Sequence, residues 1–196
     1  MARIAIDLDD TLVPTIELLI KEIFKANKTK WFKGYHSLED LSFEERDAFY
    51  KYIRQTLNNQ DIKKFKPIPG AKTIIRKLLK DHELYIITGR TIDVKNHTHK
   101  WVKEYFPNTF KEIIFSEYYK SEDFVKDKGE LCKEHGIDLI VDDNKSYIMD
   151  CYKHNIKTIV FDYKKNYPWS KSKYPNDIKI ANDWKQVYAI IKNTKF

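Results

Sequence analysis

The stretch Arg3-Ile-Ala-Ile-Asp-Leu-Asp-Asp-Thr-Leu12 joins a short apolar run to three aspartates. The run over residues 2–7 predicts a buried β-strand that ends in acid. Pro14 follows at a point where a helix can begin, because the first turn of a helix does not need the N–H that proline lacks. The first strand therefore delivers several carboxylates to one end of the predicted sheet.

From residue 67 onward, apolar runs alternate with segments of helical spacing. We expect strands at residues 84–87, 112–116, 137–141 and 158–161, and helices at about 70–79, 93–105, 128–135, 145–154 and 183–192. Strands that alternate with helices in this way predict βαβ units and a parallel sheet. The strands are continuously apolar, as expected when both faces of a sheet are covered, so the fold class is α/β.

Residues 13–66 interrupt this alternation. An apolar stripe at helical spacing runs from Ile16 to Phe24, and a capping box, Ser42-Phe-Glu-Glu45, opens a second helix. The chain has 196 residues, enough for one α/β domain with an insertion and too few for two full domains. We therefore predict a core formed by residues 1–12 and 67–196, with a small helical cap at residues 13–66.

The chain is basic, with a formal net charge of +7 and a pI of about 9.1. A positive protein raises the local concentration of anions. Either a solvated, lysine-rich surface or a phosphorylated substrate, including a polynucleotide, explains this charge. Charge alone does not choose between them.

Localisation follows from what the chain contains. Two cysteines are too few for a disulfide framework and fit a reducing compartment. No apolar run approaches the roughly 18 to 20 residues that a membrane span needs, and acid at residue 7 comes too early for a signal peptide. We expect a cytoplasmic protein without membrane contact.

Two Cys-x-x-His pairs have the spacing of zinc ligands, Cys132 with His135 and Cys151 with His154. Both pairs fall on helices that must bury one face, where cysteine is a common small apolar residue. We therefore expect core positions rather than a zinc site. His97 and His99 are expected at exposed helix positions rather than at the substrate.

Polar residues gather at the carboxyl ends of the predicted strands, where open parallel sheets bind ligands. They are Asp7, Asp9 and Asp10 after the first strand, Thr88 and Arg90 after the second, and Asp142 and Asp143 after the fourth. Carboxylates that converge on one rim repel one another, and a hard cation relieves this repulsion. Oxygen ligation suits Mg²⁺, which also bridges phosphates.

The spacing of Asp7 and Asp9 makes chemical sense for phosphate esters. One carboxylate can attack phosphorus and form an acyl phosphate, while a second carboxyl gives the leaving oxygen a proton. A solvated aspartate turn is the simpler alternative. An EF-hand loop is excluded, because Leu12 and Leu18 stand where it needs glycine and glutamate. A receiver domain is disfavoured, because Ser116 ends the middle strand where such a domain has an aspartate.

Four segments, taken in order, resemble the motifs of the haloacid dehalogenase-like superfamily. They are Asp7-Leu-Asp9-Asp10-Thr11-Leu12, Thr88-Gly89-Arg90, a lysine, and Asp142-Asp143. The resemblance covers residues 1–12 and about 67–162. It implies a Rossmann-like three-layer sandwich with a helical cap after the first strand, and a Mg²⁺-dependent phosphatase that works through an aspartyl phosphate.

The resemblance also implies roles for single residues. Asp7 is the nucleophile and a metal ligand, Asp9 is the general acid and base and binds the metal through its carbonyl, and Asp142 completes the metal site with support from Asp143. Thr88, Gly89, Asp10 and a lysine bind phosphate. That lysine is Lys128, which opens a helix, with Lys126 as the rival. Arg90 either contacts phosphate or pairs with the carboxylates of the rim.

Within the superfamily, the chain is similar to the 5′(3′)-deoxyribonucleotidase group. The similarity rests on Thr88-Gly-Arg90, Asp142-Asp143-Asn144 and Asn182-Asp183-Trp184. It implies a nucleoside monophosphate substrate whose base stacks on a cap aromatic; otherwise these aromatics fill the core of the cap. The candidates are Phe24, Trp31, Phe32 and Tyr35. A polynucleotide end, a sugar phosphate and a non-catalytic nucleotide-binding module remain alternatives, and the oligomeric state stays open.

Overall fold

The computed structural model describes residues 1–16, 18, 51, 54–58, 62–116, 127–167, 170–171 and 173–196. Its centre is a six-stranded sheet in the order β3-β2-β1-β4-β5-β6, and every neighbouring pair is parallel. The strands are β1 (Arg3–Ile6), β2 (Glu83–Thr88), β3 (Glu112–Phe115), β4 (Leu139–Asp142), β5 (Lys157–Phe161) and β6 (Lys179–Ala181). The predicted parallel α/β fold is confirmed.

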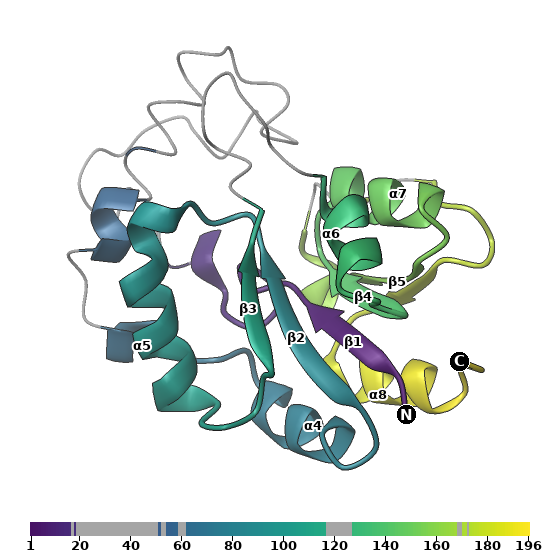
Figure 1. The fold of residues 1–196 in the computed structure, drawn as a ribbon, viewed down its shortest axis with the longest axis horizontal. Helices are drawn as coiled ribbons and strands as arrows, with labels where there is room; N and C mark the ends of the chain where they lie inside the picture. The colour runs from purple at the N-terminus through teal and green to yellow at the C-terminus, as the bar shows by residue number, and fades with distance from the viewer. Residues whose placement is uncertain are drawn as a thin grey trace.

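Helices cover both faces of this sheet (Figure 1). They are α4 (Ala71–Leu78), α5 (Lys95–Tyr105), α6 (Lys128–Glu134), α7 (Lys145–Lys153) and α8 (Trp184–Lys192), with short 3-10 helices at Ile62–Lys64, Ile92–Val94 and Tyr163–Lys165. Successive residues of a strand point to opposite faces. Ile4 and Ile6 of β1 therefore join α4, α5 and α8 in one core cluster, while Ala5 joins α6 and α7 in another.

The register of β1 positions the site. Ile6 pairs with Ile86 of β2 and with Val141 of β4, and the N–H of Asp7 donates to the carbonyl of Val141 at 2.9 Å. The carboxyl ends of β1, β2 and β4 therefore lie side by side, in agreement with Figure 1. Residues that follow these three strands meet at one edge of the sheet.

Two features differ from the sequence-based expectation or lie beyond it. The edge strand β6 was not predicted, since it has three residues and two of them are exposed. Most of the predicted cap, residues 13–66, lies outside the described residues, so its helical nature stays a prediction. Leu57 and Phe65, which are described, are buried in the core cluster of α4, α5 and α8.

Candidate active site

The loop after β1 is a compact turn held by its own backbone. The N–H groups of Leu12 and Val13 both donate to the carbonyl of Leu8, at 2.9 and 3.0 Å. Asp10 adopts a left-handed conformation with φ of 57°, which aspartate tolerates better than most residues. From the far end of the chain, the indole N–H of Trp184 donates to the carbonyl of Thr11 at 3.3 Å. The turn therefore presents Asp7 and Asp9 on a braced backbone.

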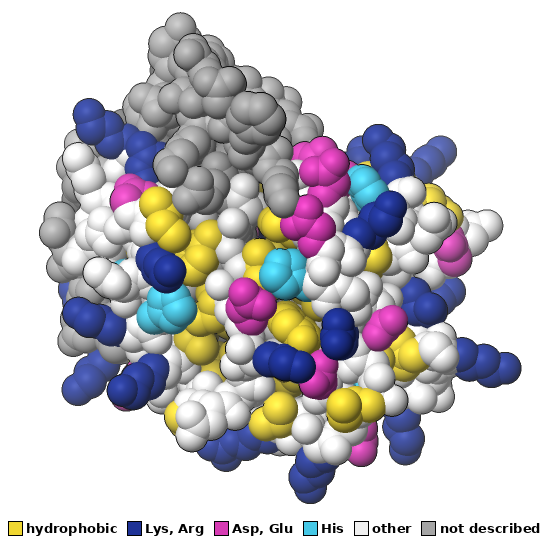
Figure 2. Space-filling view, viewed as in Figure 1, with side chains coloured by type: hydrophobic (Ala, Val, Ile, Leu, Met, Phe, Trp, Pro, Cys, Tyr) yellow, Lys and Arg dark blue, Asp and Glu magenta, His cyan; other side chains and the backbone are white. Residues whose placement is uncertain are grey.

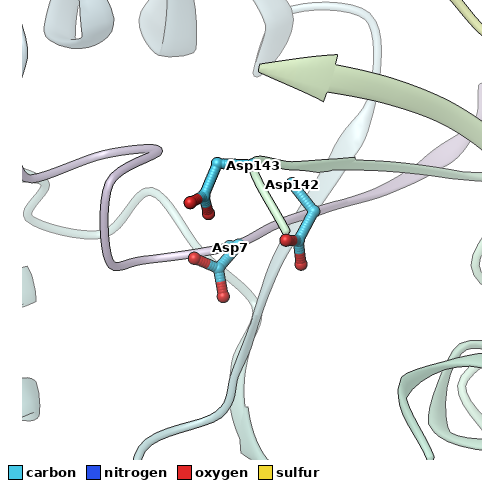
Figure 3. A group of neighbouring side chains, drawn as sticks. All are labelled: Asp7, Asp142 and Asp143. Atoms are coloured by element: carbon cyan, nitrogen blue, oxygen red, sulfur yellow. The ribbon is translucent and has the colours of Figure 1, made fainter. Parts of the chain in front are cut away.

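Three carboxylates meet at this turn. Asp7, Asp142 and Asp143 each place a carboxylate oxygen within 4.8 Å of the others (Figure 3). Asp142 is held by the N–H of Asn144 at 2.8 Å. Asp143 accepts a long hydrogen bond of 3.4 Å from the hydroxyl of Thr11. All three carboxylates are buried, which makes their mutual repulsion strong.

Lys128 partly neutralises this cluster. It is the first residue of α6 and is only 1% exposed. Its Nζ lies 2.6 Å from Oδ1 of Asp7 and 2.7 Å from Oδ2 of Asp142. The Tyr147 ring lies 4.2 Å below the same ammonium group, in cation–π geometry. The rival Lys126 lies outside the described residues.

One lysine does not balance three carboxylates. Burial raises the pKa of Asp7 to about 8; Lys128 opposes this shift, while Asp142 and Asp9 add to it. Burial disfavours the charged form of Lys128, yet Asp142 and Asp7 hold its pKa well above the ordinary value. A further positive charge would therefore stabilise the cluster. Its donors are all carboxylate oxygens, which fit a hard cation such as Mg²⁺.

Asp9 lies in a different environment. Arg90 donates to both of its oxygens, from Nε at 2.8 Å and from Nη2 at 2.7 Å, and the hydroxyl of Thr15 also donates to it. Burial works against the charge, but Arg90 and Thr15 hold the pKa of Asp9 below its ordinary value. The Nη1 of Arg90 donates to Thr98 at 3.1 Å. Of the two roles left open for Arg90, the structure shows the ion pair with a rim carboxylate.

The remaining predicted phosphate-binding residues also lie at this edge. Thr88 ends β2 and is fully buried; its Oγ1 accepts the N–H of Arg90 at 3.2 Å, and Gly89 between them is buried. The carboxylate of Asp10 accepts the N–H of Ile16 at 3.1 Å, and its own N–H donates to Val13. The N–H and the carboxylate of Asp10 are therefore engaged within the loop.

Several residues that the sequence did not single out belong to this site. Thr15 and Thr98 contact the Asp9–Arg90 pair, and Tyr147 lies under Lys128. Burial raises the pKa of Tyr174 to about 12, and the negative charges of Asp143, Asp162 and Asp142 add to this shift. The Tyr174 hydroxyl therefore lies within the electrostatic reach of the acidic cluster. Of these residues, only Thr15 could have been recognised from the sequence, because it directly follows Pro14 in the acidic loop. The four cap aromatics lie outside the described residues.

The two Cys-x-x-His pairs do not come together as one group of ligands. Cys132 and Cys151 are fully buried between α6 and α7, with their sulfurs 4.0 Å apart. His135 lies beside Glu112, and His154 beside Asp150. Across the described residues, the acidic trio is the one group of three or more carboxylate, imidazole or thiol ligands close enough to share an ion.

The two histidines of α5 differ. His99 is exposed, as expected, but His97 is only 7% exposed, so the expected exposed position was wrong for His97. Its ring meets Phe65 edge-on, with 5.9 Å between the ring centroids. The spacing of apolar residues does not by itself place an imidazole on the buried face of α5.

Solved structures share this architecture. A haloacid dehalogenase-like family hydrolase from Streptococcus pneumoniae is 17% identical, with a TM-score of 0.66 over 97% of this chain and 98% of that chain. A protein described as a predicted phosphatase from Clostridium acetobutylicum is 15% identical, with a TM-score of 0.68 over 98% and 99%. A HAD-hydrolase from Bacillus subtilis, bound to magnesium, is 15% identical, with a TM-score of 0.63 over 97% and 98%. No curated protein matches the chain.

The parallel sheet is shared with these haloacid dehalogenase-like structures, and a family match adds that the protein is a phosphatase of this class. A family model matches residues 1–196, and the chain belongs to that family, described as 5′ nucleotidase, deoxy (pyrimidine), cytosolic type C protein. Across the described residues, no helix is both long enough and apolar enough to cross a bilayer.

Proposed function

We propose that the protein is a Mg²⁺-dependent 5′-nucleotidase that hydrolyses nucleoside or deoxynucleoside monophosphates through an aspartyl phosphate on Asp7. The buried contact of Lys128 with both Asp7 and Asp142 carries the proposal. It gathers a nucleophile, a cation and a set of oxygen ligands at the edge of the sheet where parallel folds bind substrates. Family membership supports the nucleotide as substrate.

The metal site of the proposal is formed by Asp7, Asp142 and the carbonyl of Asp9, with Asp143 in support. The carboxylates of Asp7, Asp142 and Asp143 and the raised pKa of Asp7 fit a divalent cation. When bound, the cation supplies positive charge to the phosphate oxygens. A similar fold from Bacillus subtilis was solved with magnesium.

The residues of the chain carry the steps. Asp7 attacks phosphorus and becomes phosphorylated, while Asp9 gives a proton to the leaving oxygen. Lys128, Thr88 and the backbone at Gly89 hold the phosphoryl oxygens, whereas the N–H and the carboxylate of Asp10 hold the loop itself. Asp9 then takes a proton from the water that attacks the aspartyl phosphate, and inorganic phosphate leaves. The pairing of Asp9 with Arg90 keeps it ionised at rest, so it must take up a proton before the first step.

A panel of mononucleotides with Mg²⁺ tests the substrate. Phosphate release from nucleoside 5′-monophosphates should exceed release from sugar phosphates and from 5′-phosphorylated oligonucleotides. Turnover of sugar phosphates without release from any nucleotide would exclude the nucleotidase. Preference for oligonucleotide ends, with a steep dependence on salt, would instead support the polynucleotide alternative.

Asp7→Asn tests the mechanism. It should abolish phosphate release and the phosphorylated enzyme seen by mass spectrometry after an acid quench, because an amide cannot form the acyl phosphate. Asp81→Asn is the matched control, since Asp81 is an exposed acid that precedes β2, at the end of the sheet opposite the site. Unchanged activity of Asp7→Asn would refute the mechanism. Absence of turnover in the unaltered protein would favour a non-catalytic nucleotide-binding module.

A further inference from the structure

The His97 side chain is buried and has no hydrogen-bond partner among the residues that the structure describes. It lies on the inner face of α5 and is only 7% exposed. Neither Nδ1 nor Nε2 meets a partner among the described residues. A buried donor or acceptor left unsatisfied costs about 1–3 kcal/mol, and native proteins satisfy the great majority of such groups. His97 therefore has two polar atoms available for a partner that the described part of the chain does not supply.

The chemistry of that partner follows from the state of the ring. Burial, with the nearby Arg90 charge, lowers the pKa of His97 to about 4. The ring is therefore neutral at physiological pH and offers one N–H donor and one nitrogen acceptor. A hydroxyl group, which both donates and accepts, matches this pair of atoms. A cationic partner does not match this site, because the positive charge of Arg90 already lies close to the ring.

The His97 ring lies near the Asp9–Arg90 pair, because the charges of both side chains act on it. Thr98, the next residue, accepts from Arg90, and Arg90 in turn binds both oxygens of Asp9. In the proposed mechanism Asp9 protonates the leaving oxygen, so the group bonded to that oxygen lies on the Asp9 side of the site. In a nucleoside 5′-monophosphate that group is the sugar. The ring of Phe65 also contacts His97, edge-on.

We propose that His97 is a substrate-binding residue that hydrogen-bonds a hydroxyl group of the substrate's sugar. The inference rests on the proposed nucleotidase function and adds to it a sugar-binding position on α5. It makes His97 a determinant of selectivity between sugars, separate from the phosphate site formed by Asp7, Thr88 and Lys128.

The experiment crosses three substrates with four proteins. Phosphate release gives kcat/KM for UMP, dUMP and 2′,3′-dideoxyuridine monophosphate, which differ only in their sugar hydroxyls. The proteins are the unaltered chain, His97→Phe, His97→Gln and His99→Phe. Phenylalanine removes both polar atoms, glutamine keeps one donor and one acceptor, and the exposed His99 on the same helix is the matched control. Thermal unfolding of each variant is measured beside the kinetics.

The unaltered protein should lose roughly 5- to 150-fold in kcat/KM when the bound hydroxyl is removed, as expected for one unpaired buried group. His97→Phe should lower kcat/KM for the hydroxyl-bearing substrate and leave the dideoxy substrate nearly unchanged, so that the selectivity disappears. His97→Gln should restore part of the selectivity between these substrates, and His99→Phe should retain all of it.

Three results would overturn the inference. Equal losses for all three substrates in His97→Phe mean that His97 serves the fold or pairs with another part of the chain. Equal kcat/KM of the unaltered protein for all three substrates means that no sugar hydroxyl is bound, while the nucleotidase function stands. Turnover of sugar phosphates with no release from any nucleotide refutes the nucleotidase function, and the inference with it.

Discussion

At the scale of single residues, the balance of charge around Asp7 governs stability as well as chemistry. The Asp7 carboxyl has a pKa of about 8 in the folded chain, against an ordinary value of 3.8. Between about pH 4 and 8 the folded state therefore holds a proton that the unfolded state has released. The free energy of unfolding must fall as pH rises through this window. A bound divalent cation removes this loss by stabilising the carboxylate.

Asp7→Asn should therefore stabilise the metal-free protein at the upper end of this window. We expect its melting temperature at pH 8 to exceed that of the unaltered protein by about 2 °C or more, with a difference that shrinks toward pH 4. Mg²⁺ should stabilise the unaltered protein more than Asp7→Asn. Differential scanning calorimetry over the pH series measures both effects. A melting temperature for Asp7→Asn below that of the exposed control Asp81→Asn would contradict this account.

Arg90 sets the proton affinity of Asp9. Its two hydrogen bonds, with that of Thr15, hold the pKa of Asp9 below the ordinary value. Arg90→Gln should raise the pKa of Asp9, because the positive charge is lost. The limb of the pH–rate profile that reports deprotonation of the general acid should then move to higher pH. An unmoved limb, with kcat merely reduced, would mean that Asp9 is not the titrating group.

At the scale of elements, close contact between α6 and α7 fixes the start of the helix that carries Lys128. Asp150 of α7 accepts the N–H of Gly129 at 2.6 Å. A Cβ at Gly129 would lie 2.3 Å from Nδ1 of His154 and 2.9 Å from Oδ2 of Asp150. Only glycine lets the two helices approach in this way.

Gly129→Ala should destabilise the fold by about 1–3 kcal/mol through this overlap. His154→Ala removes the closer of these two contacts, so the double variant should recover part of the loss, and His154→Ala alone serves as the control. Urea unfolding of the three variants gives the coupling energy. Simple additivity of the two changes would show that the overlap is not what makes glycine necessary.

How far the sequence predicts these elements depends on the kind of signal. The ends of β1 and β4 were predictable, because each apolar run stops at aspartate and parallel strands end at the same edge. Pairing with a rim carboxylate was one of two roles predicted for Arg90, but the choice of Asp9 was not predictable. It depends on how two loops 81 residues apart approach each other. The strand β6 was missed because Lys179-Ile-Ala181 has no pattern of its own and pairs only with β5. The burial of His97 required the packing of α5 against Phe65.

At the scale of the whole molecule, the net charge of +7 acts as a diffuse field. Figure 2 shows lysine and arginine side chains spread around the outline of one face rather than gathered in a single patch. On this face, such a distribution attracts small anions and forms no continuous basic track for a polymer. We therefore regard the mononucleotide as the better match for this surface.

The dependence of kcat/KM on ionic strength distinguishes a mononucleotide substrate from a polynucleotide substrate. For a mononucleotide, kcat/KM should fall by no more than roughly tenfold between low and moderate salt, because screening weakens only long-range attraction. A 5′-phosphorylated oligonucleotide assayed in the same series should show no steeper dependence. A much steeper fall for the oligonucleotide would reveal several backbone contacts and favour the polynucleotide alternative.

The hydrogen bond from Trp184 to Thr11 spans 173 positions of the chain. During synthesis on the ribosome, the acidic turn after β1 emerges long before its brace on α8, which lies 173 positions later. The nucleophile's turn therefore lacks this hydrogen bond until α8 has been made. Nascent chains released before α8 would carry the complete set of carboxylates and still lack a competent catalytic centre.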